Sequence, residues 1–189
     1  MLVEFVKLTE RCCLARATRS DGAIVETTAT AKGGIPHDLE HFLVEQELRC
    51  DTGFWARVSQ GAEFSNFRVI RKGPLRHSRA RHHELTKGYA GWDEDLITKV
   101  VDMYREARRQ GWSPPASVPS VPTMALLLDP RRRPPTQATF DRRTLTAAAF
   151  ALHSAEQEWQ ELPVGRAVSR RWAERQPSRR APTARRRAG

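Results

Sequence analysis

The sequence predicts an α+β protein, with a small N-terminal antiparallel sheet packed by helices and followed by a helical C-terminal extension. Two observations predict this class. Residues 1–30 hold short β-rich runs separated by a turn signal, and residues 92–110 carry the pattern of a long amphipathic helix. The 189 residues are enough for one good-sized domain, or for one domain with a helical appendage.

Three runs near the N-terminus are predicted strands. "LVEFVKL" (2–8) alternates as a half-buried strand does, and "CLARAT" (13–18) and "AIVETTAT" (23–30) follow it. "RSDG" (19–22) contains an Asp-Gly pair, which favours a hairpin because glycine accepts the positive φ of a tight turn. We therefore expect these runs to form a small antiparallel sheet.

A helix is predicted over residues 36–49. Pro36 suits its first turn, where the missing N–H is not needed. Leu39, Phe42 and Leu43 form one apolar stripe along it. A short helix in "FWARVSQ" (54–60), a strand in "FSNFRVI" (64–70) and a basic loop over residues 71–91 are expected next.

The clearest helix covers residues 92–110. Its apolar residues fall on one face, acids cluster at its start and arginines at its end, as the helix dipole favours, and Gly111 stops it. After it, "TMALLL" (123–128) is apolar enough to need burial on the body, and residues 140–162 predict another helix, ended by Pro163.

These patterns divide the chain into four parts. One more short helix is predicted over residues 166–176, within the helical segment named next. The parts are an α+β domain (1–112), a proline-rich linker (113–138), a helical segment (139–176) and a disordered basic tail (177–189).

The apolar runs, the N-terminus and the cysteines exclude some classes of protein. The longest apolar runs are too short to span a membrane, and the N-terminus lacks the features of a signal peptide. The three cysteines, Cys12, Cys13 and Cys50, have no C-x-x-C spacing, so we expect reduced thiols in a cytoplasmic protein. Cys12 and Cys13 are expected to point to opposite faces of a strand.

The net charge of +10 is concentrated at the C-terminal end. Residues 166–189 hold nine arginines and one acid, while the rest of the chain carries 23 basic and 21 acidic residues. An arginine-rich tail can bind nucleic acid weakly and without sequence preference, or it can be a passive result of an arginine-rich composition. The candidate nucleic-acid-binding residues are Arg170, Arg171, Arg175, Arg179, Arg180, Arg185, Arg186 and Arg187.

The most specific candidate chemistry lies in "HDLEH" (37–41). His37 and His41 are four residues apart, so both project from one face of the helix and could share one zinc ion. The order H-x-x-E-H resembles that of the inverted zinc proteases, and the resemblance covers these five residues only. It implies that Glu40 would be the general base and that an acidic ligand would come from a second helix.

The third ligand is not identified by spacing. Glu45, Glu63 and Glu84 are possible, and His82 or His83 of the basic loop could also contribute. The alternative is an ordinary packed helix in which His41 lies beside Val44 and Leu48 and bonds a backbone carbonyl. In that case no metal and no other cofactor is expected.

A broader resemblance covers about residues 1–70. The run "PHDLEHFLVEQEL", followed by "GFW" (53–55) and "GAEFSN" (61–66), is similar to a group of small uncharacterised bacterial proteins common in actinobacteria. The resemblance implies that residues 1–70 form one unit, and it implies no known activity.

Three functions stay open at this point. The first is a small binding or regulatory protein without catalysis, acting on an unknown protein partner. The second is a metal-dependent hydrolase built on His37, Glu40 and His41. The third is a nucleic-acid-binding protein that uses the arginine-rich tail and the basic loop.

Overall fold

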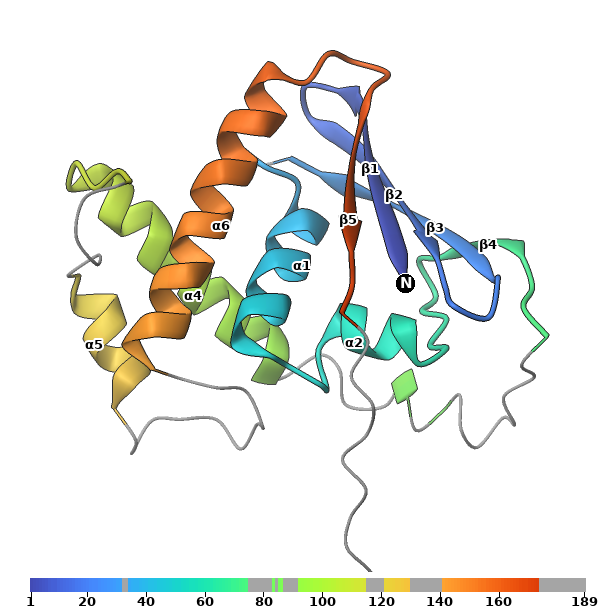
Figure 1. Cartoon of the computed structure of the whole chain (residues 1–189), viewed down its shortest axis with the longest axis horizontal. Coiled ribbons are helices and arrows are strands. Elements are labelled where there is room, and N and C mark those ends of the chain that lie inside the picture. Colours follow the sequence, from blue (N-terminus) through green and yellow to red (C-terminus); the bar gives the residue numbers. More distant parts are fainter. Residues whose placement is uncertain are drawn as a thin grey trace, which may run out of the picture.

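The computed structural model of the chain describes residues 1–31, 34–74, 83, 85–86, 92–114, 121–129 and 141–173. It contains a five-stranded antiparallel sheet packed by helices and a helical C-terminal region, which confirms the α+β class (Figure 1). Among the described residues, no helix combines the length and the apolar character needed to cross a membrane.

The sheet has the strand order β4-β3-β2-β1-β5, and every neighbouring pair is antiparallel. The predicted N-terminal strands are confirmed, and Gly22 has the positive φ of 80° that the Asp-Gly turn requires. The strands are β1 (Leu2–Thr9), β2 (Cys12–Thr18), β3 (Ile24–Thr30), β4 (Arg68–Arg71) and β5 (Ala167–Arg171).

The fifth strand corrects the sequence prediction for residues 166–176, which we expected to form a short helix. Ala167–Arg171 instead pairs with β1, from Leu2 opposite Arg171 to Val6 opposite Ala167. Without β5, the backbone N–H and C=O groups on this edge of β1 would have no partner in the sheet. This distant pairing therefore outweighs the local preference of an Ala- and Arg-rich run for helix.

The helices predicted over residues 36–49, 54–60, 92–110 and 140–162 are confirmed with small shifts at their ends, and the apolar run at 123–128 forms a further helix. α4 ends before Gly111, whose φ is 82°, and α6 begins with a capping box between Asp141 and Thr144. The helices are α1 (His37–Leu48), α2 (Phe54–Ser59), α4 (Trp92–Arg109), α5 (Pro122–Leu128) and α6 (Arg142–Glu161).

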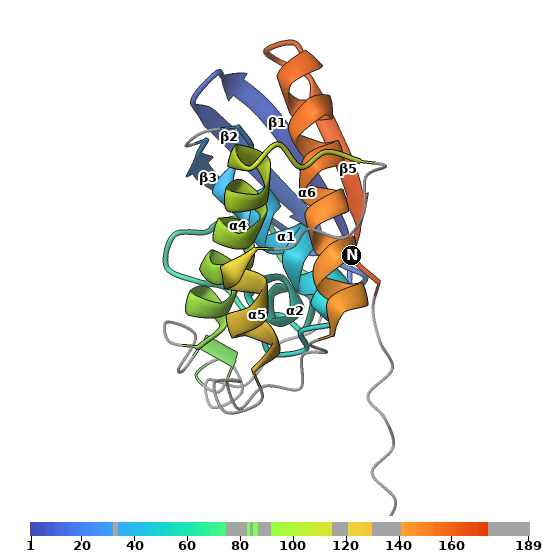
Figure 2. The same ribbon diagram turned by 90° about the vertical axis from the view of Figure 1, so that its left-hand side faces the viewer.

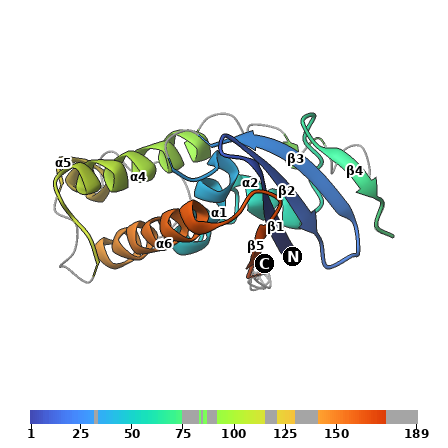
Figure 3. The same ribbon diagram turned by 90° about the horizontal axis from the view of Figure 1, so that it is seen from above.

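All of these helices lie on one side of the sheet (Figure 3). The inner face of the sheet is lined by buried small and apolar residues, including Phe5, Ala15 and Val25. Cys13 points into this core and its neighbour Cys12 is half-buried, as the alternation of a strand predicts. All three cysteines are free thiols.

α1 occupies the centre of the helical layer. It packs against α6 on one side and α4 on the other, while α5 packs against α4 through Met124 and Leu127 (Figure 2). The apolar run at 123–128 is thus buried on the body, as we expected. The contact between α1 and α4 is the one that positions the candidate site.

Candidate metal centre

α1 brings the two predicted histidines together. The Nε2 atoms of His37 and His41 are 3.2 Å apart, and their ring centroids are 4.3 Å apart. The His41 side chain is 3% exposed and the His37 side chain is 51% exposed. The pair therefore has one member in the core and one at the surface.

Glu94, from the first turn of α4, joins this pair. Its Oε1 lies 3.2 Å from Nε2 of His37, and its Oε2 lies 3.3 Å from Nε2 of His41. Two imidazole nitrogens and one carboxylate therefore converge on one point, and their ligand atoms all lie within 4.8 Å of one another.

These separations match the coordination of a small divalent ion. Zinc binds imidazole nitrogen at about 2.0–2.1 Å, so two ligand atoms of a tetrahedral site lie about 3.3 Å apart. The Nε2 atoms of His37 and His41 lie 3.2 Å apart. The three side chains could therefore hold an ion with little movement.

A carboxylate lies beside the second nitrogen of each histidine. Oδ1 of Asp38 is 3.5 Å from Nδ1 of His37, and Oε1 of Glu45 is 3.5 Å from Nδ1 of His41. The carboxylate of Glu45 is close enough to Nδ1 of His41 for a charge interaction. The two groups are not aligned as a hydrogen bond, and Nδ1 of His41 makes no hydrogen bond in this structure. Carboxylates in these positions orient metal-binding imidazoles and make them stronger ligands.

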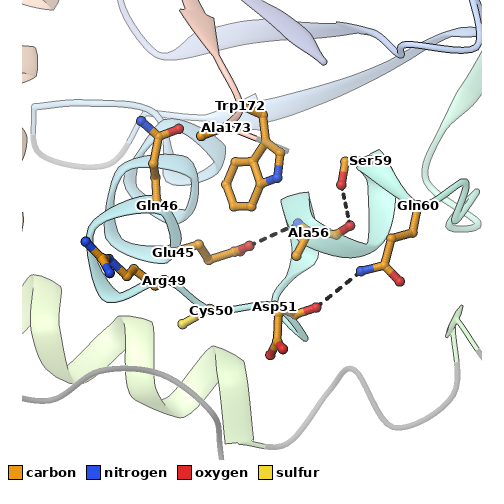
Figure 4. Close-up of a pocket in the computed structure, with 10 residues that line it drawn as sticks. All are labelled: Glu45, Gln46, Arg49, Cys50, Asp51, Ala56, Ser59, Gln60, Trp172 and Ala173. Atoms are coloured by element: carbon orange, nitrogen blue, oxygen red, sulfur yellow. Dashed lines mark hydrogen bonds between the residues drawn. The ribbon is translucent and has the colours of Figure 1, made fainter. Parts of the chain in front are cut away.

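Glu45 is itself fixed by the fold. Its fully buried carboxylate accepts the backbone N–H groups of Phe54 and Trp55, each at 2.9 Å, and that of Ala56 at 3.4 Å. These groups belong to the first turn of α2, whose N–H groups have no partner within the helix. Figure 4 shows the carboxylate of Glu45 directed at this turn. Glu45 thus joins α1 to α2 and stands beside His41.

The electrostatics of the site favour a cation. Burial opposes the charging of His41, but the Glu45 and Glu94 carboxylates outweigh it and raise the pKa of His41 to about 9. The contact with His41 lowers the pKa of Glu94 to about 2. Groups that stabilise an imidazolium here would also stabilise a metal ion in its place. Because the ion needs neutral imidazoles, its binding must compete with protons.

A small cavity adjoins the histidines. Its volume is about 200 Å³, and His37, Glu40, His41 and Arg105 line it together with apolar residues of α4. Nη2 of Arg105 donates to Oε1 of Glu40 at 2.8 Å. Burial nevertheless raises the pKa of Glu40 to about 6. The proposed general base therefore lies on the same cavity as both histidines.

A second cavity, of about 220 Å³, lies at the other end of α1 (Figure 4). It is lined by residues that include Arg49, Cys50 and Trp172. Glu45 borders it, but His37 and His41 do not. This second cavity therefore does not contain the candidate metal centre.

Glu94 is the candidate ligand that sequence reasoning missed. We assigned it to the acidic start of α4, and among the acids that we considered, Glu45 faces the other nitrogen of His41. Glu63 is not in the cluster, and Glu84 lies outside the described residues. One signal could have found it: Glu94 continues the stripe formed by Ile97 and Val101, both buried.

Of the other sequence-predicted residues, those that the structure describes are not brought to this site. Arg170 and Arg171 lie on β5, where Arg170 pairs with Glu158. The candidates Arg175, Arg179, Arg180, Arg185, Arg186 and Arg187 lie outside the described residues. In the basic loop His82 also falls outside them, and His83 is exposed.

Comparisons with protein-family models, with curated proteins and with solved structures found no match. The class of this protein is therefore described from its fold and its site alone. It is an α+β protein with a three-residue candidate metal centre between two helices. The resemblance of residues 1–70 to small actinobacterial proteins stays a prediction.

Proposed function

We propose that the protein binds a divalent transition-metal ion through His37, His41 and Glu94 and uses it in a hydrolytic reaction. The observation that carries this proposal is the convergence of Nε2 of His37, Nε2 of His41 and the Glu94 carboxylate at separations of 3.2–3.3 Å. The carboxylates beside both Nδ1 atoms support the same conclusion.

Zinc is the ion that best fits this donor set. Two histidines and one glutamate, with the fourth position left to water or substrate, form a common catalytic zinc site. A closed structural site would instead use four protein ligands. The cavity beside His37 and His41 gives the fourth position room for a small molecule.

Glu40 is the residue proposed to move the proton. The metal would supply the polarisation of an attacking water molecule, and the Glu40 carboxylate would accept the proton that this water loses as it attacks a carbonyl carbon. Glu40 then returns the proton to the leaving group as the bond to that group breaks. Its raised pKa of about 6 suits a group that must accept and release a proton near neutral pH.

The competing interpretation is a hydrogen-bond chain without metal. One imidazole would donate to the other, and Glu94 would accept the remaining proton. The metal content of the purified protein, measured by plasma mass spectrometry, separates the two interpretations. We expect near-stoichiometric zinc in the wild type and its loss in Glu94→Gln and in the double variant His37→Ala/His41→Ala.

His83→Ala is the matched control, because it removes an exposed histidine that does not belong to the group formed by His37, His41 and Glu94. Its zinc content should equal that of the wild type. Zinc titration by calorimetry, after chelator treatment, should give one site in the wild type and in this control. A wild type that neither contains nor binds zinc would overturn the proposal. Non-catalytic partner binding and nucleic-acid binding stay predictions.

A further inference from the structure

One ion pair joins the two helices that form the candidate metal centre. Nη2 of Arg105, on α4, donates a hydrogen bond to Oε1 of Glu40, on α1, at 2.8 Å. Both residues line the cavity that His37 and His41 also line. The pair therefore lies beside the group of atoms that could hold the ion, and it includes the residue proposed to move the proton.

The same pair borders a neighbouring cavity. That cavity has a volume of about 290 Å³ and lies at the C-terminal part of α4, where Tyr104 and Arg108 also line it. Of the described residues, Glu40 and Arg105 are the two that line both this cavity and the metal cavity. Their side chains therefore form the boundary between the two spaces, and a change in either one alters the wall of the metal cavity.

The bond to Arg105 occupies one oxygen of the Glu40 carboxylate and leaves the other free. Within the described part of the chain, Oε2 of Glu40 makes no hydrogen bond. This oxygen is also not among the polar atoms that are both unpartnered and shut off from solvent. The Glu40 carboxylate is therefore held through one oxygen and can accept a proton through the other.

Arg105 is suited to fix the position of this carboxylate. A glutamate side chain has several rotatable bonds, so an unrestrained carboxylate samples several positions. The planar guanidinium of an arginine presents its donors in fixed directions. The other acid near Arg105 is Asp102, whose carboxylate is 3.9 Å away and beyond hydrogen-bond distance. Glu40 is therefore the carboxylate that Arg105 binds directly.

We infer that Arg105 is a positioning residue for the proton transfer at the metal centre, because it holds the Glu40 carboxylate in place while one oxygen stays free to accept the proton. The inference rests on the proposed function and adds one residue to it. Arg105 acts through Glu40 and does not hold the ion, since the group that could do so is His37, His41 and Glu94. Removing Arg105 should therefore impair proton acceptance and leave zinc binding intact.

Binding of acetohydroxamic acid to the zinc-loaded protein tests this inference and requires no known substrate. A hydroxamic acid occupies an open zinc position through its oxygens and gives its hydroxyl proton to a base beside the ion, which here is Glu40. Calorimetry measures its dissociation constant, and a zinc titration measures the affinity for the ion. Arg105→Gln should raise the hydroxamate dissociation constant about tenfold, and Glu40→Gln at least as much. The zinc affinity of both variants should equal that of the wild type.

A double variant shows whether Arg105 acts through Glu40. If it does, Glu40→Gln/Arg105→Gln should bind the hydroxamate no more weakly than Glu40→Gln alone. Arg105→Lys keeps the charge but loses the planar set of donors, so its affinity should lie between those of the wild type and Arg105→Gln. Arg109→Gln is the matched control. Arg109 is 70% exposed, pairs with Glu106 on its own helix and does not line the metal cavity, so this variant should behave as the wild type.

The outcomes separate this inference from the proposed function. A wild type that binds no zinc, or that binds zinc but no hydroxamate, would overturn the proposed function and the inference with it. Wild-type hydroxamate affinity in Arg105→Gln, with zinc still bound, would overturn the inference alone. A double variant that is about tenfold weaker than Glu40→Gln would do the same, because Arg105 would then act independently of Glu40. If Arg105→Gln does not fold, Arg105→Lys decides, and wild-type hydroxamate affinity in that variant would contradict the role of Arg105.

Discussion

Replacing Glu45 tests the junction between the candidate site and the fold. Its buried carboxylate accepts two N–H groups at 2.9 Å, from Phe54 and Trp55, and a third more weakly from Ala56. Each buried donor that loses its partner costs about 1–3 kcal/mol. Glu45→Ala removes the acceptor for the two strong bonds, so the free energy of unfolding should fall by about 4 kcal/mol.

Glu45→Gln removes the negative charge of this side chain and keeps its shape. The amide oxygen can replace one acceptor, but the NH2 group cannot accept the other N–H, so this variant should lose about half as much stability, about 2 kcal/mol. Urea unfolding of the metal-free protein measures both values. Glu47→Gln makes the same chemical change two residues further along α1, at a half-buried position on another face of the helix, and should change stability by less than about 0.5 kcal/mol.

Glu45→Gln also tests the metal centre. Without the Glu45 carboxylate, His41 loses the group that faces its Nδ1 atom at 3.5 Å. Losing such a partner weakens metal binding by about 10- to 100-fold. The reasoning would be refuted if Glu45→Gln unfolded at the same urea concentration as the wild type and bound zinc with the same affinity.

Three further predictions concern pH, packing and thiol reactivity. The folded-state pKa of His41, about 9, exceeds its ordinary value of 6.5, so its contribution to the stability of the metal-free protein is complete below pH 6.5 and is lost as the pH rises through 9. Urea unfolding at several pH values should show this fall, and His41→Gln should reduce it. Gly53→Ala should cost about 1–3 kcal/mol in the same assay, because a Cβ there would lie 2.3 Å from Oε2 of Glu45; an unchanged stability would contradict the close packing. Thiol labelling of the native protein should modify Cys12 but not Cys13, since burial raises the pKa of Cys13 to about 12, and equal labelling rates would contradict this.

Local signals made most of the fold predictable. The Asp-Gly turn at Gly22, the acid-to-base polarity of α4 and its Gly111 stop are each set within a few residues of chain, so the sequence displays them directly. β5 differs because its pairing joins residues about 165 positions apart. Nothing within Ala167–Arg171 specifies that contact, and Val168 is its only buried residue.

The candidate site likewise has a part that the sequence predicts and a part that depends on how the helices pack. His37 and His41 are four residues apart on one helix, so helical geometry alone brings their side chains together. Glu94 reaches them only because α1 and α4 pack against each other in the core. The role of Glu45 depends likewise on the position of α2. Sequence periodicity gives the face of each helix, but not the angle at which two helices cross.

The pH dependence of metal binding separates a metal centre from a packed pair of histidines. Raising the pH from 6 toward 8 weakens the competition of protons with the ion for His37 and His41, because the pKa of each is raised in the folded metal-free protein. Weaker proton competition increases the stabilisation that zinc provides, so the rise in melting temperature caused by a fixed zinc concentration should be larger at pH 8 than at pH 6. The control His83→Ala should behave as the wild type, and Glu94→Gln should show little rise at either pH. An equal rise at both pH values would mean that zinc binds somewhere other than these histidines.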